Sequence, residues 1–245
     1  MRILIGTPIE ESKAFCLNRL YHALKVLFIP RACLVGILFL VTLKPSLNFL
    51  RRVNYVAKKL GEKYAFAGVG KLEDKQKSWN RCSLEGAREL IRNFALNHFD
   101  ADYLCFVDAD NPPPKDALDR LLTLDADIAG GLVYQRMRNG EETYPLVYEY
   151  SGPPPNDPML RPGWEKIGPL KLKDINGKEG VIDADGVGFG CILIKRQVYA
   201  EIPFQSGLFN SEDTEFCHRA RMKGYRIKVD LELHVPHYIN EKEWV

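Results

Sequence analysis

The chain has 245 residues, of which 46% are hydrophobic and 27% charged, so it is long and apolar enough for one α/β domain with a complete core. Its 34 basic and 32 acidic residues are interspersed and give a net charge of +2, which argues against a nucleic-acid-binding protein. The six cysteines form no CxxC pair and lie mostly in apolar surroundings. They predict buried thiols in a reduced, cytosolic protein rather than a disulfide or zinc framework.

The first part of the chain alternates short apolar runs with amphipathic segments. Apolar runs rich in β-branched and aromatic residues predict strands, and apolar residues at helical spacing predict helices. We expect strands at residues 2–7, 32–41, 64–69, 103–107 and 128–134, and helices at 10–25, 45–60, 83–97 and 116–124. This alternation predicts a doubly wound, mostly parallel sheet flanked by helices, in which Pro8 ends the first strand.

Residues 26–43, VLFIPRACLVGILFLVTL, form a strongly apolar segment. Its uninterrupted apolar part is about ten residues long, whereas a membrane-spanning helix needs about 20, so we expect a buried strand. Contact with the inner membrane surface is the alternative use of this segment. The apolar part of the N-terminal MRILIGTP is too short for a signal peptide, which adds to the expectation of a cytoplasmic protein.

The alternation of strand and helix breaks at residues 135–183. Five prolines lie between residues 153 and 162, and neither helices nor central strands tolerate such a cluster. Long irregular segments inside compact domains are usually functional, so we interpret this one as an insertion over a cleft. Its aromatic residues could stack on a ligand: Tyr144, Tyr148, Tyr150 and Trp164. An ordinary surface hairpin is the alternative. Regular structure should return with a strand at 191–194, which follows closely spaced glycines.

An acid pair, Asp108 and Asp110, follows the apolar run YLCFV at residues 103–107. The three prolines of NPPP at residues 111–114 then open a loop, so both acids lie at the carboxyl end of a central strand. Residues i and i+2 of an extended chain point the same way, and carboxylates suit Mg²⁺ or Mn²⁺. The pair therefore predicts a divalent cation site. The alternative is a turn that caps the following helix.

A second acidic cluster, SEDTE at residues 211–215, has the composition of a helix start. Acids at this position stabilise a helix by interacting with its dipole, which is one sufficient explanation for them. The functional alternative is that one acid points into the cleft as a general base. Two histidines follow near the end of the chain, His234 and His237. A late histidine is often only a packed residue, but imidazole also commonly completes the ligand set of a Mn²⁺ site.

In this order, the motifs resemble those of the glycosyltransferases with the GT-A fold, of the broad family 2 type. FVDAD at residues 106–110 resembles the DxD metal-binding motif, and residues 211–227 resemble the helix block that carries the ED pair. GVGFGCILIKR at 186–196 resembles the segment before that block, and Gly86-Ala87-Arg88 the helix start before the metal-binding strand. The resemblance extends from residue 1 to about residue 238.

The resemblance implies a metal-dependent, inverting transfer of a sugar from a nucleoside diphosphate to an acceptor hydroxyl. Mn²⁺ or Mg²⁺ would be bound by Asp110 and His237, with His234 as the second choice. Asp108 would either contact the ribose of the nucleotide or bind the metal through water. Asp213 would be the catalytic base, with Glu212 beside it shaping the acceptor site. The donor-binding residues would be Thr7, Pro8, Glu10, Arg88, Asp108, Ala109 and Gly190. The family usually has an acid or an Asn-Ser pair after the second strand, where this chain reads LVTLK at 40–44.

Two other functions stay open at this point. A sugar nucleotidyltransferase would need a glycine-rich loop with a basic residue after the first strand, and GTPIEESK at 6–13 is too acidic for that. A non-catalytic homologue would use the same cleft only to bind glycans or nucleotides. We expect one domain over residues 1–245, with a nucleotide-binding half (1–134), an insertion or lid (135–183) and an acceptor half (184–245). Its partners would be a nucleotide-sugar donor and a glycan, lipid or small-molecule acceptor, with no nucleic acid.

Overall fold

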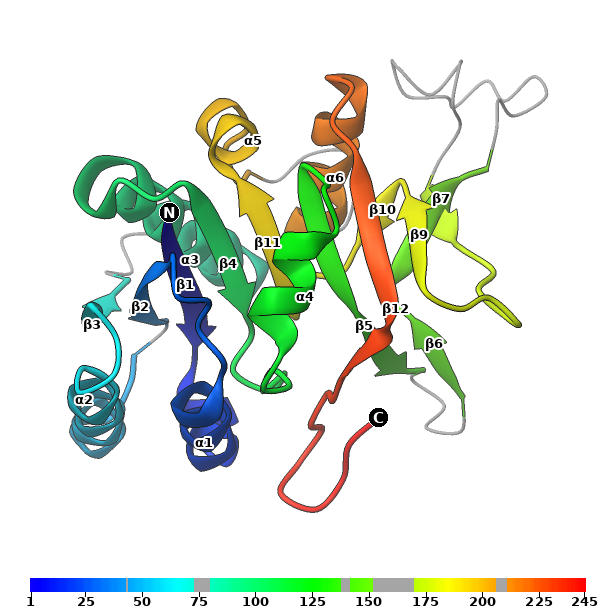
Figure 1. Ribbon diagram of the computed structural model, residues 1–245. Helices are drawn as coiled ribbons and strands as arrows, with labels where there is room; N and C mark the ends of the chain where they lie inside the picture. Colours follow the sequence, from blue (N-terminus) through cyan, green and yellow to red (C-terminus); the bar gives the residue numbers. More distant parts are fainter. Residues whose placement is uncertain (43, 73–79, 138–141, 152–169, 206–210) are drawn as a thin grey trace.

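A large sheet runs through the whole molecule (Figure 1). The computed structural model describes residues 1–42, 44–72, 80–137, 142–151, 170–205 and 211–245. The strands of the large sheet are β1 (Arg2–Ile9), β2 (Leu34–Val41), β3 (Phe66–Lys71), β4 (Tyr103–Val107), β5 (Ile128–Arg136), β6 (Thr143–Pro145), β9 (Val181–Ala184), β11 (Cys191–Lys195) and β12 (Ile227–Val235). Their order is β3-β2-β1-β4-β11-β5-β12-β9, and β6 pairs with β5.

Half of the strand pairings of this sheet are parallel, whereas the sequence predicts a mostly parallel sheet. β1 pairs in parallel with β2 and β4, β2 with β3, and β5 with β12. β11 is inserted antiparallel between β4 and β5, and β9 closes the edge antiparallel to β12. Two successive reversals leave β4 and β5 pointing the same way, so their carboxyl ends lie at one edge of the sheet together with those of β1 and β12.

Helices cover both faces of the sheet. They are α1 (Leu17–Val26), α2 (Leu47–Leu60), α3 (Asn80–Phe94), α4 (Ala117–Thr123), α5 (Arg196–Glu201) and α6 (Glu212–Met222), with short turns η1 (Glu11–Lys13) and η2 (Ala95–Phe99). The first hydrophobic core holds side chains of α1, α2 and α4, and the second those of α3, α5 and α6. β4 contributes Cys105 and Val107 to the first core and Leu104 and Phe106 to the second, as the period of two in a strand requires.

Strand β1 does not end at Pro8, so this part of the prediction is wrong. The strand continues to Ile9, whose carbonyl accepts a hydrogen bond from the Thr42 amide of the β2 side at 2.9 Å. Pro8, one residue earlier, therefore directs its backbone toward the β4 side, where pairing stops at Gly6. No neighbouring strand requires an N–H from Pro8, which is why the proline is tolerated there.

The apolar segment forms a core strand, as expected. Its residues from Val35 to Val41 are buried within β2. Three large side chains of the segment stay exposed, namely Val26, Phe28 and Leu34. No helix in the described ranges is both long and apolar enough to cross a bilayer.

The described parts of the 135–183 segment contain short strands that the sequence analysis does not predict. β7 (Val147–Tyr150) and β8 (Leu170–Leu172) join β10 (Gly186–Val187) in a separate three-stranded sheet. The strands are too short and too mixed in polarity to show a clear period of two. The prolines at 153–162 and Trp164 lie outside the described residues. Cys16, Cys33, Cys105, Cys191 and Cys217 are free thiols, and Cys82 lies outside the described side chains.

Candidate active site

The carboxyl ends of β1 and β4 border a cavity of about 220 Å³. Because these strands are parallel neighbours, the residues that follow each of them meet at this edge. The cavity is lined by Pro8, Ile9, Glu10, Lys13, Thr42, Leu84, Asp108, Ala109 and Asp110. It therefore brings the first strand, the acid pair and the start of α3 to one place.

The two acids follow β4 in a turn, not in an extended chain. β4 ends at Val107, and the Asn111 amide donates to the Asp108 carbonyl at 3.0 Å. The rule that residues i and i+2 face the same way does not apply to a turn. As a result, the carboxylates of Asp108 and Asp110 have different partners.

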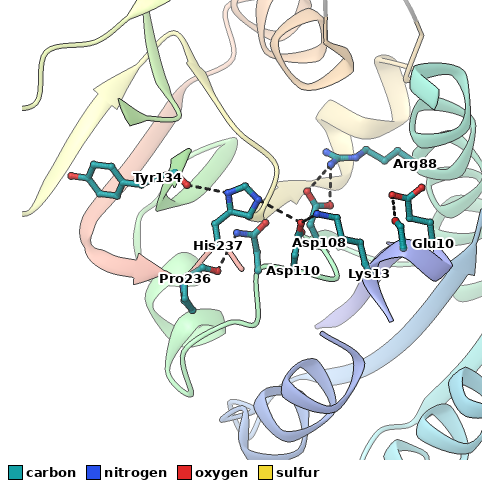
Figure 2. A network of polar contacts seen from close by, with 10 residues as sticks. Glu10, Lys13, Arg88, Asp108, Asp110, Tyr134, Pro236 and His237 are labelled. Atoms are coloured by element: carbon teal, nitrogen blue, oxygen red, sulfur yellow. Dashed lines mark hydrogen bonds and ion pairs between the residues drawn. The ribbon is translucent and has the colours of Figure 1, made fainter. Parts of the chain in front are cut away.

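Asp110 faces the C-terminal segment of the chain. The Nε2 atom of His237 lies 3.5 Å from Oδ2 of Asp110 (Figure 2). The Tyr238 amide donates to the Asp110 carbonyl at 2.9 Å. Nδ1 of His237 is 3.1 Å from the Tyr134 carbonyl, which can only accept a hydrogen bond, so Nδ1 carries a proton. In the neutral imidazole this leaves the lone pair on Nε2, directed at Asp110, which is the tautomer a metal ligand needs.

His237 and Asp110 also shift each other's pKa. Burial alone would lower the pKa of His237, but the facing carboxylate of Asp110 outweighs it and the pKa is raised. Burial would raise the pKa of Asp110, yet His237 and Lys13 together hold it below its ordinary value. Asp110 is therefore a carboxylate at neutral pH, ready to hold a cation.

Lys13 is a site residue that the sequence analysis missed. It ends η1, and its Nζ atom lies 2.6 Å from Oδ2 of Asp110. It belongs to the stretch GTPIEESK at 6–13, in which the sequence analysis assigns Thr7, Pro8 and Glu10 to the donor but gives Lys13 no role. Its approach to Asp110 depends on the path of η1 after β1, which no local pattern of residues announces.

Asp108 faces the opposite side, toward Arg88 of α3. Nη2 of Arg88 lies 3.0 and 3.1 Å from the two carboxylate oxygens of Asp108, and its Nε lies 3.4 Å from Oε1 of Glu212 (Figure 2 shows the first pair). The buried guanidinium lies beside the rings of Phe106 and Phe189, at 5.3 and 5.1 Å from their centroids. Its Nη1 has no hydrogen-bond partner among the described residues. One arginine thus links the acid pair to the acids of α6.

This arrangement shifts the pKa of two carboxyl groups. Burial raises the pKa of Asp108 to about 7, against the opposing charge of Arg88, and the neighbouring carboxylates Asp110, Glu212 and Asp213 add to the rise. Burial likewise raises the pKa of Glu212, again opposed by Arg88. The charge of Asp213 acts on both Asp108 and Arg88, so the start of α6 lies within electrostatic reach of the strand end.

Asp213 is held by the first turn of α6. Its Oδ1 accepts hydrogen bonds from the Thr214 amide at 2.7 Å and from the Ser211 hydroxyl. The predicted helix start at Ser211 is confirmed, since Ser211 is the N-cap. Both of these hydrogen bonds use Oδ1, so Oδ2 of Asp213 is the oxygen that could accept a proton.

The donor-binding residues of the prediction lie around the same cavity or directly behind it. Pro8, Glu10 and Ala109 line it, while Thr7 is fully buried and its hydroxyl has no described hydrogen-bond partner. The Gly190 carbonyl accepts from the Asp108 amide at 3.1 Å.

His234 does not join this group. It is exposed on β12 and lines a different cavity, bordered by residues 175–179. Of the two late histidines, only His237 faces the acid pair.

The side chains around the acid pair supply two ligands that suit a divalent ion. No group of three or more acidic, histidine or cysteine side chains converges within the described ranges. Oδ2 of Asp110 and Nε2 of His237 do converge, whereas Asp108 is engaged by Arg88. These two side chains fit a hard or borderline divalent ion, provided that phosphate oxygens and water supply its other ligands.

No family model matches the sequence, and a search of curated proteins finds no significant match. Solved structures do match it. The mannosyltransferase PcManGT from Pyrobaculum calidifontis, in complex with GDP-Man and Mn²⁺, has a TM-score of 0.58 over 96% of this chain at 12% identity. GalNAc-T7 with UDP, GalNAc and Mn²⁺ has a TM-score of 0.64 over 98% of the chain at 13% identity.

The chain has the GT-A fold. The predicted fold class is thereby confirmed. A197 from STIV also matches, with a TM-score of 0.50 and 16% identity, over 100% of this chain and 93% of its own length. By contrast, the chain spans 56% of PcManGT and 44% of GalNAc-T7. It thus corresponds to about half of each of these two proteins.

Proposed function

We propose that this protein is a metal-dependent, inverting glycosyltransferase that moves a sugar from a nucleoside diphosphate to an acceptor hydroxyl. The observation that carries the proposal is the meeting of Asp110, His237 and the acids of α6 at one edge of a GT-A sheet, beside a cavity. Residues from four separate parts of the chain gather there. The presence of nucleotide sugars or their parts and Mn²⁺ in two structures of the same fold supports this use of the edge.

The donor would bind in the cavity at the ends of β1 and β4. Thr7, Pro8 and Glu10 would border the base and ribose, and Ala109 and Gly190 would allow close approach of the diphosphate. The stretch LVTLK at 40–44, after the second strand, holds no acid that would identify the nucleotide, and the two similar structures hold different ones, GDP-Man and UDP. A panel of nucleotide sugars is therefore needed.

The metal would be held by Asp110 and His237. Bound there, Mn²⁺ or Mg²⁺ would supply Lewis-acid stabilisation of the charge that develops on the departing diphosphate. Asp108, which is engaged by Arg88, would act on the ribose or through water.

The acceptor would be activated from α6. Asp213 would remove the proton of the acceptor hydroxyl through Oδ2 as that oxygen attacks the anomeric carbon opposite the diphosphate. One such displacement inverts the configuration. Glu212, which lies beside Arg88, would shape the acceptor side. Tyr148 of β7 lies within electrostatic reach of Asp213, so the short second sheet would border the acceptor.

A cytoplasmic protein with peripheral membrane contact fits the exposed apolar residues Val26, Phe28 and Leu34 beside Lys25 and Arg31. These residues lie at the amino ends of β1 and β2, whereas the cavity lies at the carboxyl ends. The eight residues of β1 separate them by about 25 Å. A lipid acceptor would have to reach the cleft over that distance, which favours glycan or small-molecule acceptors. Sedimentation with anionic liposomes tests the contact, and protein that stays wholly in the supernatant would exclude it.

The decisive experiment incubates the protein with GDP- and UDP-sugars and Mn²⁺. It measures thermal shifts and nucleoside diphosphate release with glycan acceptors. We expect Asp213→Asn to keep donor binding and to lower turnover by about 10²- to 10⁴-fold, as loss of a general base does. Asp119→Asn, an exposed acid of α4, is the control.

Three other outcomes would contradict the proposal. Donor binding without turnover would identify a binding homologue. Pyrophosphate release from a nucleoside triphosphate and a sugar phosphate would identify a nucleotidyltransferase. Equal turnover in Asp213→Asn and wild type would remove the base assignment.

A further inference from the structure

One oxygen of Asp110 has two competing partners. Oδ2 lies 2.6 Å from Nζ of Lys13 and 3.5 Å from Nε2 of His237. His237 is fixed by its bond to the Tyr134 carbonyl. The ion pair of Lys13 is made by the tip of its side chain, and about a third of that side chain is exposed to solvent. The lysine is therefore the partner that can leave.

A divalent ion on Asp110 and His237 would meet the Lys13 ammonium at close range. Metal–oxygen and metal–nitrogen bonds are about 2.0–2.6 Å long, so an ion on Oδ2 would lie within a few ångströms of Nζ. Two cations cannot share one carboxylate oxygen at that separation without strong repulsion. Lysine has a flexible four-carbon stem, so the ammonium can move away while the backbone of η1 stays in place.

The cavity offers a destination for the displaced ammonium. Among the described residues that line it, Lys13 is the only one with a positive charge. A nucleoside diphosphate that enters between β1 and β4 brings phosphate charge past this side chain. An ammonium near Asp110 can reach that charge with a change of side-chain rotamers alone.

We propose that Lys13 is the resident counter-ion of Asp110, that the divalent ion displaces it, and that the freed ammonium then binds the donor's diphosphate. The inference rests on the proposed function and extends it to a residue of the site. It makes metal binding and donor binding mutually supportive: the ion frees the lysine, and the diphosphate then neutralises it. It also predicts that the metal binds weakly without nucleotide.

The test compares wild type, Lys13→Met and Lys58→Met. Methionine keeps the length of the lysine stem without its charge. Lys58 is an exposed lysine of α2 and serves as the control. The N-terminus of α2 contacts η1 through Ser46, and Lys58 lies eleven residues further along the helix, or about 16 Å. Mn²⁺ binding without nucleotide is measured by electron paramagnetic resonance, and binding of GDP and UDP is measured by calorimetry with and without Mn²⁺.

We expect Lys13→Met to bind Mn²⁺ without nucleotide on the order of tenfold more tightly than wild type. The ion no longer has to replace the charge-assisted hydrogen bond of Lys13, and one such bond corresponds to a factor of about ten in the dissociation constant. With Mn²⁺ present, it should bind the nucleoside diphosphate on the order of tenfold more weakly. Lys58→Met should match wild type in both measurements.

Unchanged or weaker Mn²⁺ binding by Lys13→Met would overturn the inference, as would unchanged diphosphate affinity. These outcomes are distinguishable from failure of the proposed function. If no nucleotide sugar is turned over by wild type but Lys13→Met still gains Mn²⁺ affinity, the ion competition stands and the transferase assignment falls.

Discussion

Arg88 is the residue whose replacement should tell most about this site. Its guanidinium bridges Asp108 and Glu212 and lies within cation–π distance of the rings of Phe106 and Phe189. We consider Arg88→Met, which keeps an unbranched side chain beside the rings but removes the charge. Breaking a buried ion pair by removing one partner costs about 3–5 kcal/mol, since the other charges stay buried without compensation. The lost cation–π contacts, about 0.5–2 kcal/mol each, are partly offset by sulfur–aromatic contacts of about 0.3–1.5 kcal/mol.

The loss should depend on pH in a definite direction. The pKa of Asp108 is already raised to about 7 by burial, and Arg88 is the charge that restrains it. Below pH 7 the buried carboxyl of Asp108 is protonated in both proteins, so it adds little to the difference in their free energies of unfolding. As the pH rises above 7, Asp108 of the wild type ionises beside Arg88. In the variant, Asp108 must either keep its proton or become a buried charge without a partner. The deficit in unfolding free energy should therefore widen from pH 6 to pH 8.5.

Thermal unfolding at several pH values measures this effect. A loss of 3–5 kcal/mol corresponds to roughly 6–20 °C in a protein of this size, at about 2–4 °C per kcal/mol. Arg196→Met, which removes the largely exposed pair with Asp100, is the control and should lower the midpoint by no more than a few degrees. An Arg88→Met protein that melts within a few degrees of wild type at both pH values would show that the bridge does not hold these acids.

Two further predictions concern the neighbours of the acid pair. In Gly190→Ala the new Cβ would lie 2.8 Å from Oδ1 of Asn111, whose side-chain amide donates a hydrogen bond to the Pro236 carbonyl next to His237. We expect this clash to destabilise the protein by about 1–3 kcal/mol and to weaken Mn²⁺ binding. The control is Gly86→Ala, whose Cβ would have its nearest contact at 3.7 Å and should not destabilise the protein. In metal-free protein, His237→Ala should lower the melting temperature more at pH 5.5 than at pH 8.5. The pKa of His237 is raised, so its charged pair with Asp110 stabilises the fold at low pH and is lost as the pH rises through that pKa. An equal effect at both pH values would contradict the pairing, and His234→Ala is the matched control.

The strands that carry the site could be predicted because burial on both faces leaves a strong signal. β4 begins and ends at the predicted residues, since YLCFV is apolar throughout and is followed by polar residues and prolines. The start of α6 was also predictable, because Ser211 and the acids after it are the residues that a helix N-terminus favours. Both signals are local, so they survive without knowledge of the tertiary structure.

The partners of the acids could not be predicted in the same way. Arg88 belongs to a helix whose apolar spacing says nothing of a buried guanidinium, and Lys13 reaches Asp110 across 97 positions of sequence. β11 enters the sheet antiparallel between β4 and β5, a reversal that the alternation in the first part of the chain does not predict. These features follow from long-range packing, which a reading of local patterns does not contain.

The turn after β4 explains how two acids in one short motif come to do different work. Had residues 108–110 stayed extended, both carboxylates would face one cation, and Arg88 would find no partner on β4. The turn instead directs Asp108 to Arg88 and Asp110 to His237 and Lys13. An ion held as proposed would depend on a single acid of the motif, and its other described protein ligand would come from the far end of the chain. Such a site is incomplete until phosphate oxygens join it, so a cation bound there would be coupled to the presence of a donor by the number of ligands alone.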